Sequence, residues 1–233
     1  MSDFIHRGVI EGFYGPPYSH ADRLWLIERL GAWGMNRYVY APKDDPLHRA
    51  QWRTAYGSST LDEFAELVQH GRSAGVEVGF AISPGLTIEY ASGADLRALQ
   101  SKFHSFQALG ARFFCLALDD VPTVLLHAGD QARFGSLAKA HVHVAQAVAD
   151  ALGAGSTLWL VPTDYVGVEP TDYLEVLGRE LAPSIEIGWT GRTVLSPTIT
   201  AAEAARRAAT LRRRLLVWDN VPVADGPMRP MLH

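Results

Sequence analysis

Two adjacent carboxylates, Asp119 and Asp120, are the residues of this sequence best suited to catalysis. They follow the apolar run RFFCLAL and precede Val121 and Pro122, so they lie where a buried strand emerges. Carboxylates this close repel each other when both are ionised, so one of them should hold its proton near neutral pH. A proton donor beside a negative neighbour suits the cleavage of a glycosidic bond. Taken alone, the dipeptide is equally compatible with a solvated turn or a magnesium site.

Seven short runs rich in β-branched and aromatic residues alternate with longer segments of helical periodicity. This alternation is typical of repeated βα units whose strands form a parallel sheet. We therefore predict an α/β fold of the (β/α)8 TIM-barrel type, with residues 1–225 forming one catalytic barrel domain. The strand-like runs are residues 8–15, 37–42, 77–84, 112–120, 157–165, 186–191 and 215–220.

The eighth strand of such a barrel is not visible in this sequence. Only thirteen residues follow Asn220, and Pro222, Pro227 and Pro230 among them cannot donate to a central ladder. We expect residues 226–233 to form a truncated C-terminal loop. A barrel without one strand leaves the edges of its first and last strands unpaired, so we also expect a neighbouring subunit or an additional segment to cover them.

Polar and aromatic residues gather where the predicted strands end. In a (β/α) barrel the active site lies at the carboxyl ends of the strands, because the βα loops converge there. The concentration of such residues at this edge indicates an active site more strongly than any one of them does. They are Glu11, Tyr14, Lys43, Asp119, Asp120, Asp164, Tyr165, Trp189, Trp218, Asp219 and Asn220.

Capping residues predict where three of the helices begin. Ser19 can accept a hydrogen bond from the first turn of the helix that follows it. Thr60 with Glu63, and Thr200 with Glu203, have the spacing of a capping box, in which each side chain bonds the backbone N–H of the other residue.

The composition excludes several classes of protein. The formal net charge is −4 and the only basic run is residues 212–214, so nucleic acid is not an expected partner. The single cysteine, Cys115, excludes an intrachain disulfide and a multi-cysteine metal site. No signal-peptide pattern is present, and no apolar stretch approaches the roughly 20 residues that span a bilayer. We therefore expect a cytoplasmic protein without membrane contact.

Two further features concern the source and the cofactors. Only three of the 21 basic residues are Lys, a bias typical of GC-rich bacterial genomes. The sequence has no glycine-rich phosphate loop and no dinucleotide-binding motif, so we expect neither a cofactor nor a metal.

Seven segments carry a resemblance to a known family. They are GVIEGFYG, YVYAPKDDP, AISPGL, LALDDV, PTDY, WTG and VWDN, in this order, between Gly8 and about Asp225. Together they resemble the catalytic domain of glycoside hydrolase family 84, which includes protein O-GlcNAcases and bacterial β-N-acetylglucosaminidases. Each segment alone would be a weak signal, but the combination is specific.

The resemblance implies a retaining exo-β-N-acetylglucosaminidase with a substrate-assisted mechanism. In that mechanism the 2-acetamido oxygen of the substrate attacks the anomeric carbon and forms an oxazoline, so the enzyme supplies no nucleophile. Asp119 would orient the acetamido N–H and stabilise the positive charge that it gains. Asp120 would protonate the leaving oxygen and then, as the conjugate base, deprotonate the incoming water.

The resemblance also implies a pocket for one N-acetylglucosamine. Gly12 would offer its backbone carbonyl, Lys43 would donate to sugar oxygens, and Tyr165 would donate to the acetamido oxygen. Trp218 would form the wall around the acetamido methyl group. The implied binding residues are Gly12, Lys43, Tyr165, Trp218, Asn220 and Asp225, the last on the distal hydroxyls. A solvated loop position for Lys43 and a purely core position for Trp218 are the alternatives.

Other functions remain open at this point. An endo-acting, hyaluronidase-like hydrolase would need an open groove instead of a pocket. A catalytically weak GlcNAc-binding module would result if the missing strand removed part of the site. A magnesium-dependent barrel enzyme could use Asp119 and Asp120 as ligands.

Overall fold

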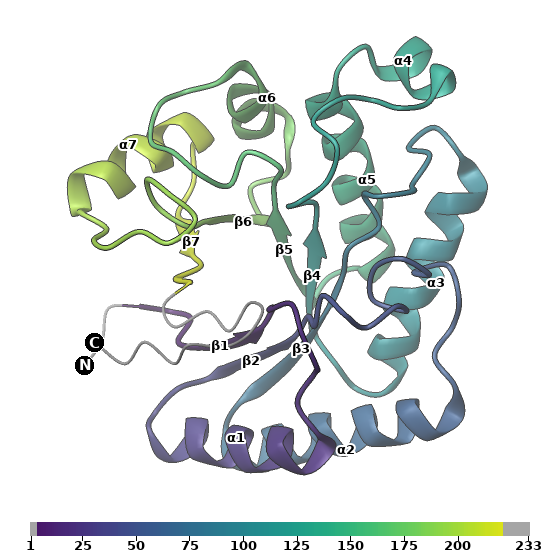
Figure 1. Ribbon diagram of the computed structural model, residues 1–233, viewed down its shortest axis with the longest axis vertical. Coiled ribbons are helices and arrows are strands. Elements are labelled where there is room, and N and C mark those ends of the chain that lie inside the picture. The colour runs from purple at the N-terminus through teal and green to yellow at the C-terminus, as the bar shows by residue number, and fades with distance from the viewer. Residues whose placement is uncertain (1–3, 221–233) are drawn as a thin grey trace.

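The computed structural model describes residues 4–220, and its centre is a curved sheet of seven parallel strands (Figure 1). Each strand is hydrogen-bonded to the next one along the chain. All seven predicted strands are therefore confirmed. They are β1 (Gly8–Glu11), β2 (Arg37–Tyr40), β3 (Glu77–Ile82), β4 (Phe113–Ala117), β5 (Thr157–Val161), β6 (Glu186–Trp189) and β7 (Leu215–Val217).

The described part of the sheet is an open half-barrel, like a TIM barrel that lacks a strand. β1 and β7 lie at the two ends of the strand order and share no backbone ladder within residues 4–220. Side chains bring the two edges together, because Gly12 after β1 lies against the indole of Trp218 after β7. The predicted fold class is confirmed, whereas the expected tail at residues 226–233 lies outside the described residues.

Helices surround the curve of strands on its outer side (Figure 1). Neighbouring helices pack in pairs: α1 on α2, α3 on α5, α5 on α6, and α6 on α7. Within the described residues they are α1 (His20–Ala32), α2 (Ser58–Ala74), α3 (Gly93–Ala108), α4 (Ala128–Phe134), α5 (Leu137–Leu152), α6 (Asp172–Glu180) and α7 (Ala201–Leu211).

Two of the three predicted helix starts are confirmed. Ser19 caps α1, and Thr200 caps α7 in a capping box with Glu203. The predicted start of α2 at Thr60 is wrong, because Gly57 holds the extended cap position and the helix begins immediately after it. A cap residue needs a non-helical backbone, and Thr60 already lies in the first turn.

The sheet has a hydrophobic core on each face, because successive residues of a strand point to opposite sides. One core lies between the sheet and the helices and includes Tyr38, Phe80 and Phe114. The other fills the inside of the curve, and we call it the inner cluster. The inner cluster consists of Val39, Ala41, Ala81, Phe113, Cys115, Trp159, Val161, Leu216 and Trp218.

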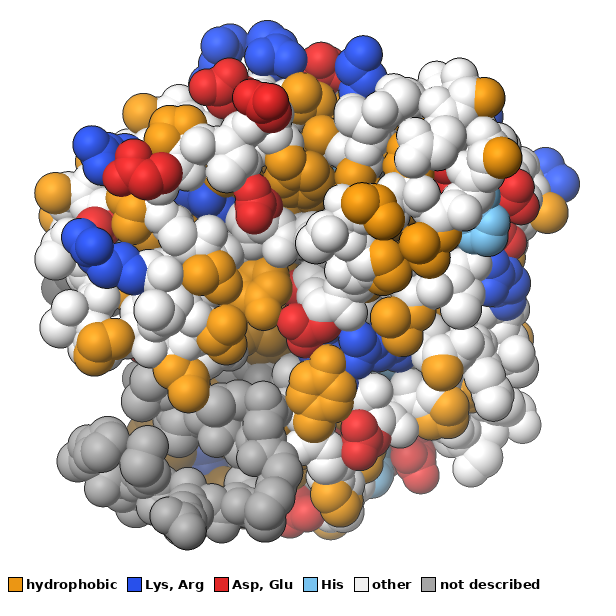
Figure 2. Space-filling view, turned by 45° about the horizontal axis from the view of Figure 1, so that its top comes forward, with side chains coloured by type: hydrophobic (Ala, Val, Ile, Leu, Met, Phe, Trp, Pro, Cys, Tyr) orange, Lys and Arg blue, Asp and Glu red, His pale blue; other side chains and the backbone are white. Residues whose placement is uncertain are grey.

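The surface carries charges of both signs. On the face shown in Figure 2, acidic and basic side chains are interspersed, and a hollow lies near the middle of the face. None of the helices within residues 4–220 combines the length and the apolar character that a membrane crossing needs.

Candidate active site

A pocket lies at the carboxyl ends of the strands. Seven of the predicted site residues line it: Gly12, Lys43, Asp119, Asp120, Tyr165, Trp218 and Asn220. Tyr14, Val161, Thr190 and Val194 complete the lining. The remaining predicted residue, Asp225, lies outside the described residues.

Strand geometry explains why these side chains share one pocket. Alternate residues of a strand share a face, so Lys43 continues the inward side of Val39 and Asp119 continues that of Cys115. Trp218 belongs to the inner cluster itself. Residues far apart in the chain therefore converge because each is at an inward position just past its strand.

Lys43 and Asp119 form a buried ion pair. Lys43 Nζ lies 2.5 Å from Asp119 Oδ2 and 3.7 Å from Asp120 Oδ2, and the side chains of Lys43 and Asp119 are 4% and 9% exposed. A solvated loop lysine is therefore excluded. The second oxygen of the Asp119 carboxylate, Oδ1, is buried and has no hydrogen-bond partner within residues 4–220. It is a vacant acceptor beside the pocket.

Asp120 departs from the strand pattern, because its backbone has a left-handed φ of 46°. Strict alternation would send its side chain away from Asp119, and the left-handed residue breaks that alternation. The carboxylate instead accepts two phenolic hydrogen bonds, from Tyr14 to Oδ2 and from Tyr165 to Oδ1, each 3.0 Å long. Aspartate is among the residues that tolerate this conformation best.

The two tyrosines remain hydroxyl donors over the ordinary pH range. Burial, followed by the nearby Asp120 carboxylate, raises the pKa of Tyr165. Burial also raises the pKa of Tyr14, although the hydrogen bond from Arg49 opposes this increase. A protonated phenol can donate to a carboxylate or to a substrate carbonyl oxygen, which is the part predicted for Tyr165.

Gly12 is required by the close approach of Trp218. A Cβ atom at position 12 would lie 2.5 Å from Cζ2 of the indole, which is far inside van der Waals contact. Trp218 is 9% exposed and lines the pocket as well as packing in the inner cluster. Trp218 thus belongs both to the inner cluster and to the lining of the pocket, and its contact with an acetamido methyl group stays a prediction. Asn220 is held by a 2.8 Å hydrogen bond from Nδ2 to the carbonyl of Val194.

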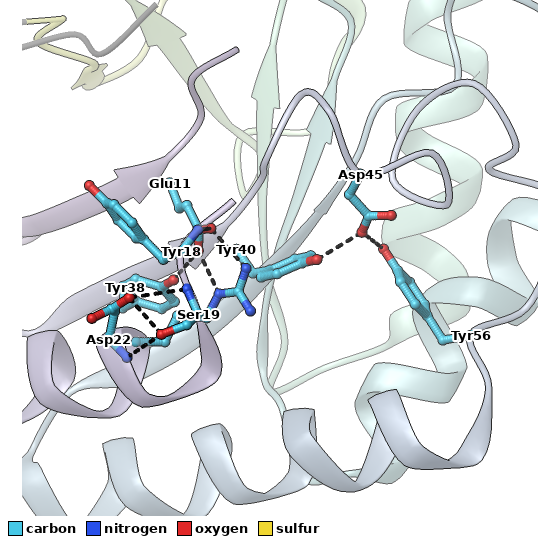
Figure 3. Close-up of polar contacts among 9 residues, drawn as sticks. Glu11, Tyr18, Ser19, Asp22, Tyr38, Tyr40, Asp45 and Tyr56 are labelled. Atoms are coloured by element: carbon cyan, nitrogen blue, oxygen red, sulfur yellow. Dashed lines mark hydrogen bonds and ion pairs between the residues drawn. The ribbon is translucent and has the colours of Figure 1, made fainter. Parts of the chain in front are cut away.

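Glu11 lies at the carboxyl end of β1 but does not line the pocket. Its side chain lies beside Tyr38 (Figure 3). Its carboxylate is fully buried and accepts two 2.9 Å hydrogen bonds from Arg23 of α1 and one from the hydroxyl of Tyr38. As the neighbour of the inward Ile10, Glu11 faces outward and ties β1 to α1. It therefore positions the strand before Gly12.

Asp45 supports the loop that carries Lys43. Its Oδ2 accepts hydrogen bonds from Tyr40 at 2.8 Å and from Tyr56 at 2.6 Å (Figure 3), and its Oδ1 accepts one from the backbone of Leu47 at 2.8 Å. These contacts hold the residues between β2 and α2 against the barrel, so the backbone that carries Lys43 is fixed.

Two further strand-end residues also serve as supports. Trp189 is fully buried and donates from Nε1 to the carbonyl of Gly167 at 2.7 Å. Asp164 accepts a 2.6 Å hydrogen bond from Thr171, and Arg207 donates to its backbone carbonyl. These contacts brace the segment that carries Tyr165.

Four residues in or beside the pocket were not predicted from the sequence: Arg49, Val161, Thr190 and Val194. Arg49 bonds two pocket residues, donating from Nη1 to the Tyr14 hydroxyl at 2.7 Å and from Nη2 to the Asp120 carbonyl at 2.9 Å. It lies in an irregular loop with no periodic pattern, so no sequence signal pointed to it. Thr190 of the WTG segment could have been found by its place after β6.

The described residues do not favour the magnesium interpretation. Within residues 4–220, no group of three or more His, Cys, Asp or Glu side chains that could hold a metal ion is found. The Lys43 ammonium lies within 4 Å of both Asp119 and Asp120 and already supplies their counter-charge.

The profile of the β-N-acetylglucosaminidase family matches residues 7–233. The chain belongs to this family, glycoside hydrolase family 84. The protein O-GlcNAcases of Rattus norvegicus and Mus musculus are each 34% identical to this β-N-acetylglucosaminidase-family chain over 224 residues. The match covers 94% of this chain and 24% of each relative.

A solved structure of a mutant O-GlcNAc hydrolase from Thermobaculum terrenum is similar to this family member, with a TM-score of 0.95 and 37% identity. The similarity covers 99% of this chain and 50% of the other. The chain therefore spans about a quarter of the length of the curated relatives and half of the solved structure.

Proposed function

We propose that this chain is the catalytic domain of a retaining exo-β-N-acetylglucosaminidase that removes terminal β-linked GlcNAc by substrate-assisted catalysis. The vacant acceptor on Asp119 carries the proposal: Oδ2 binds Lys43, whereas the buried Oδ1 has no partner among residues 4–220. An acetamido N–H would satisfy that oxygen. Leaving a buried acceptor unpaired costs about 1–3 kcal/mol, so the site favours a ligand with a donor there.

The reaction proceeds in two steps. The acetamido oxygen forms a bond to the anomeric carbon while the bond from that carbon to the aglycone oxygen breaks, and Asp120 gives its proton to the leaving oxygen. Asp119 stabilises the positive charge of the resulting oxazolinium ring. Water then adds to the anomeric carbon, Asp120 takes a proton from it, and the ring opens to GlcNAc with retained configuration.

The rest of the pocket fits this substrate. Lys43 donates to sugar oxygens from a side chain held beside Asp119, and Gly12 offers its carbonyl. The hydroxyl of Tyr165 turns from Asp120 to the acetamido oxygen during attack, and the face of Trp218 covers the acetamido methyl. Asn220 and Asp225 bind the remaining sugar hydroxyls.

The substrate class follows from the relatives, which are named O-GlcNAcase and O-GlcNAc hydrolase. We therefore propose GlcNAc glycosides or glycoproteins as substrates. We place the reaction in the cytoplasm, and the free, buried thiol of Cys115 fits such a reducing environment.

Hydrolysis of two GlcNAc glycosides, one with an activated phenol and one with a poor leaving group, tests the proposal. Asp120→Ala should slow the poor substrate by roughly 10²–10⁴-fold and the activated one much less, because only the former needs protonation in the transition state. Asp150→Ala, which removes an exposed carboxylate on α5, is the matched control and should leave both rates unchanged. Equal loss on both substrates would contradict the acid role.

Asp119→Ala should slow both substrates, because orientation of the acetamido group is needed whatever leaves. Inverted product configuration, or a trapped glycosyl-enzyme adduct, would contradict substrate assistance. Release of single GlcNAc residues from an oligosaccharide distinguishes exo from endo action, and activity that survives a chelator excludes the magnesium alternative.

A further inference from the structure

The backbone of Asp120 and the partner of its carboxylate are both bound to one guanidinium. Arg49 Nη2 donates to the Asp120 carbonyl at 2.9 Å, and Arg49 Nη1 donates to the Tyr14 hydroxyl at 2.7 Å. Tyr14 in turn donates to Asp120 Oδ2 at 3.0 Å. The guanidinium carbon also lies 5.4 Å from the centre of the Tyr14 ring. Arg49, Tyr14 and Asp120 thus form a closed triangle of contacts.

Arg49 is well placed to hold this triangle, because its neighbour His48 is anchored to the end of β3. The fully buried His48 ring bonds the carbonyl of Ala81 through Nδ1 at 2.8 Å. The backbone N–H of Ser83 donates to the carbonyl of His48 at 3.0 Å. The Arg49 backbone is therefore fixed against the barrel even though its loop has no regular structure.

We infer that Arg49 is a positioning residue for the acid–base carboxyl of Asp120, an inference that rests on the proposed function. It does two things at once. Its bond to the carbonyl favours the left-handed backbone that brings the carboxyl to the pocket. Its bond to the Tyr14 oxygen occupies an acceptor position of that oxygen, which favours the orientation in which the phenolic proton is donated to Asp120.

Donating hydrogen bonds to these two oxygens at the same time requires a guanidinium. An arginine presents several N–H donors in a rigid fork and can reach both oxygens together, whereas a lysine ammonium is a single point on a flexible stem. A merely structural arginine would lower stability without changing which substrates are affected. A positioning residue for the acid should instead reproduce the leaving-group dependence of the acid itself.

The test measures kcat/KM for the two GlcNAc glycosides with Arg49→Met and Arg49→Lys, each alone and combined with Asp120→Ala. Arg53→Met is the matched control, because Arg53 lies on the same loop but bonds Asp95 and Thr87 away from the pocket. Thermal unfolding of every variant shows whether it is folded. Arg49→Lys, which retains the charge, serves the test if Arg49→Met does not fold.

For Arg49→Met we expect roughly 100-fold loss on the poor leaving group and only a few-fold loss on the activated phenol, the scale of a small misplacement of a catalytic group. Arg49→Lys should lie between wild type and Arg49→Met. In the Asp120→Ala background either change should have less than about a twofold effect, since the group to be positioned is gone.

Equal loss on both substrates, or losses that multiply with those of Asp120→Ala, overturns the inference. If Asp120→Ala discriminates between the substrates and the Arg49 variants do not, only the role of Arg49 is wrong. If Asp120→Ala does not discriminate, or the wild-type protein hydrolyses neither substrate, the proposed function fails and the inference fails with it.

Discussion

Replacing Gly12 by alanine should disturb both the closure of the barrel and the pocket wall. The added Cβ would lie 2.5 Å from Trp218 Cζ2, 3.0 Å from Cη2 and 3.2 Å from Cγ2 of Ile10. Ordinary carbon–carbon contacts are about 3.5–4.0 Å, so the indole must withdraw by about 1 Å. Trp218 cannot do so freely, because it packs in the inner cluster.

The expected magnitude follows from this misfit. Overpacking of a well-packed site typically costs about 1–3 kcal/mol. In a domain of this size each kcal/mol lowers the melting temperature by about 2–4 °C. Because Trp218 is also the proposed wall for the acetamido methyl, binding of a GlcNAc-type inhibitor should weaken by roughly tenfold, which is about 1.4 kcal/mol.

Thermal unfolding and inhibitor titration by calorimetry measure the two effects. Gly93→Ala is the matched control: its added Cβ at the start of α3 meets only the flexible end of Arg97 at 3.2 Å, so it should be neutral or slightly stabilising. Trp218→Phe combined with Gly12→Ala should recover part of the lost stability by removing the clashing atoms. Wild-type stability and affinity in Gly12→Ala would refute the reasoning from close approach.

Three further predictions follow from buried groups. Lys43→Met should destabilise the protein by about 3–5 kcal/mol in urea unfolding, because it leaves the Asp119 carboxylate buried without a counter-charge; the exposed Lys139→Met is the control, and equal effects would contradict the ion-pair argument. Burial lowers the pKa of His141 to about 3, below its value in the unfolded chain. The stability that comes from burying the neutral imidazole is therefore present above about pH 6.5 and is lost as the pH falls. Between pH 7 and pH 5 the free energy of unfolding should drop by about 2 kcal/mol on this account, and His141→Gln should remove that part of the drop. Burial, followed by Asp119, raises the pKa of the Cys115 thiol, so iodoacetamide should label it only after unfolding, and rapid labelling of the native protein would show that the inner cluster opens.

The strands and most of the site could be predicted from the sequence because their signals are local. A buried parallel strand is a short apolar run, and the residues just past it lie at the face of the barrel that carries the site. Lys43, Asp119 and Trp218 each follow such a run, and the structure brings all three into one pocket. The same signals could not locate the start of α2, since a capping-box spacing at Thr60 says nothing about how the preceding loop enters the helix.

Glu11 and Arg49 show two ways in which local reasoning fails. Glu11 is at the end of a strand, but one residue of difference sends its side chain to the opposite face, where it pairs with Arg23. Arg49 belongs to a loop whose conformation is determined by distant partners such as Ala81, so its position had no periodic signal. Both contacts depend on how separate segments pack.

The sequence by itself determined the number and order of the strands, the polar residues at their carboxyl ends, and the pairing of two carboxylates at one strand end. These properties come from hydrophobic periodicity and from the alternation of side chains along a strand, which act over a few residues. Only the tertiary structure decided that Lys43 forms an ion pair with Asp119, 76 positions away in the sequence, and that Trp218 fills the space beside Gly12. It also decided that the backbone of Asp120 adopts a left-handed conformation. Those facts depend on the curvature of the sheet and on the loops around its mouth, and these are set by packing among all seven strands at once.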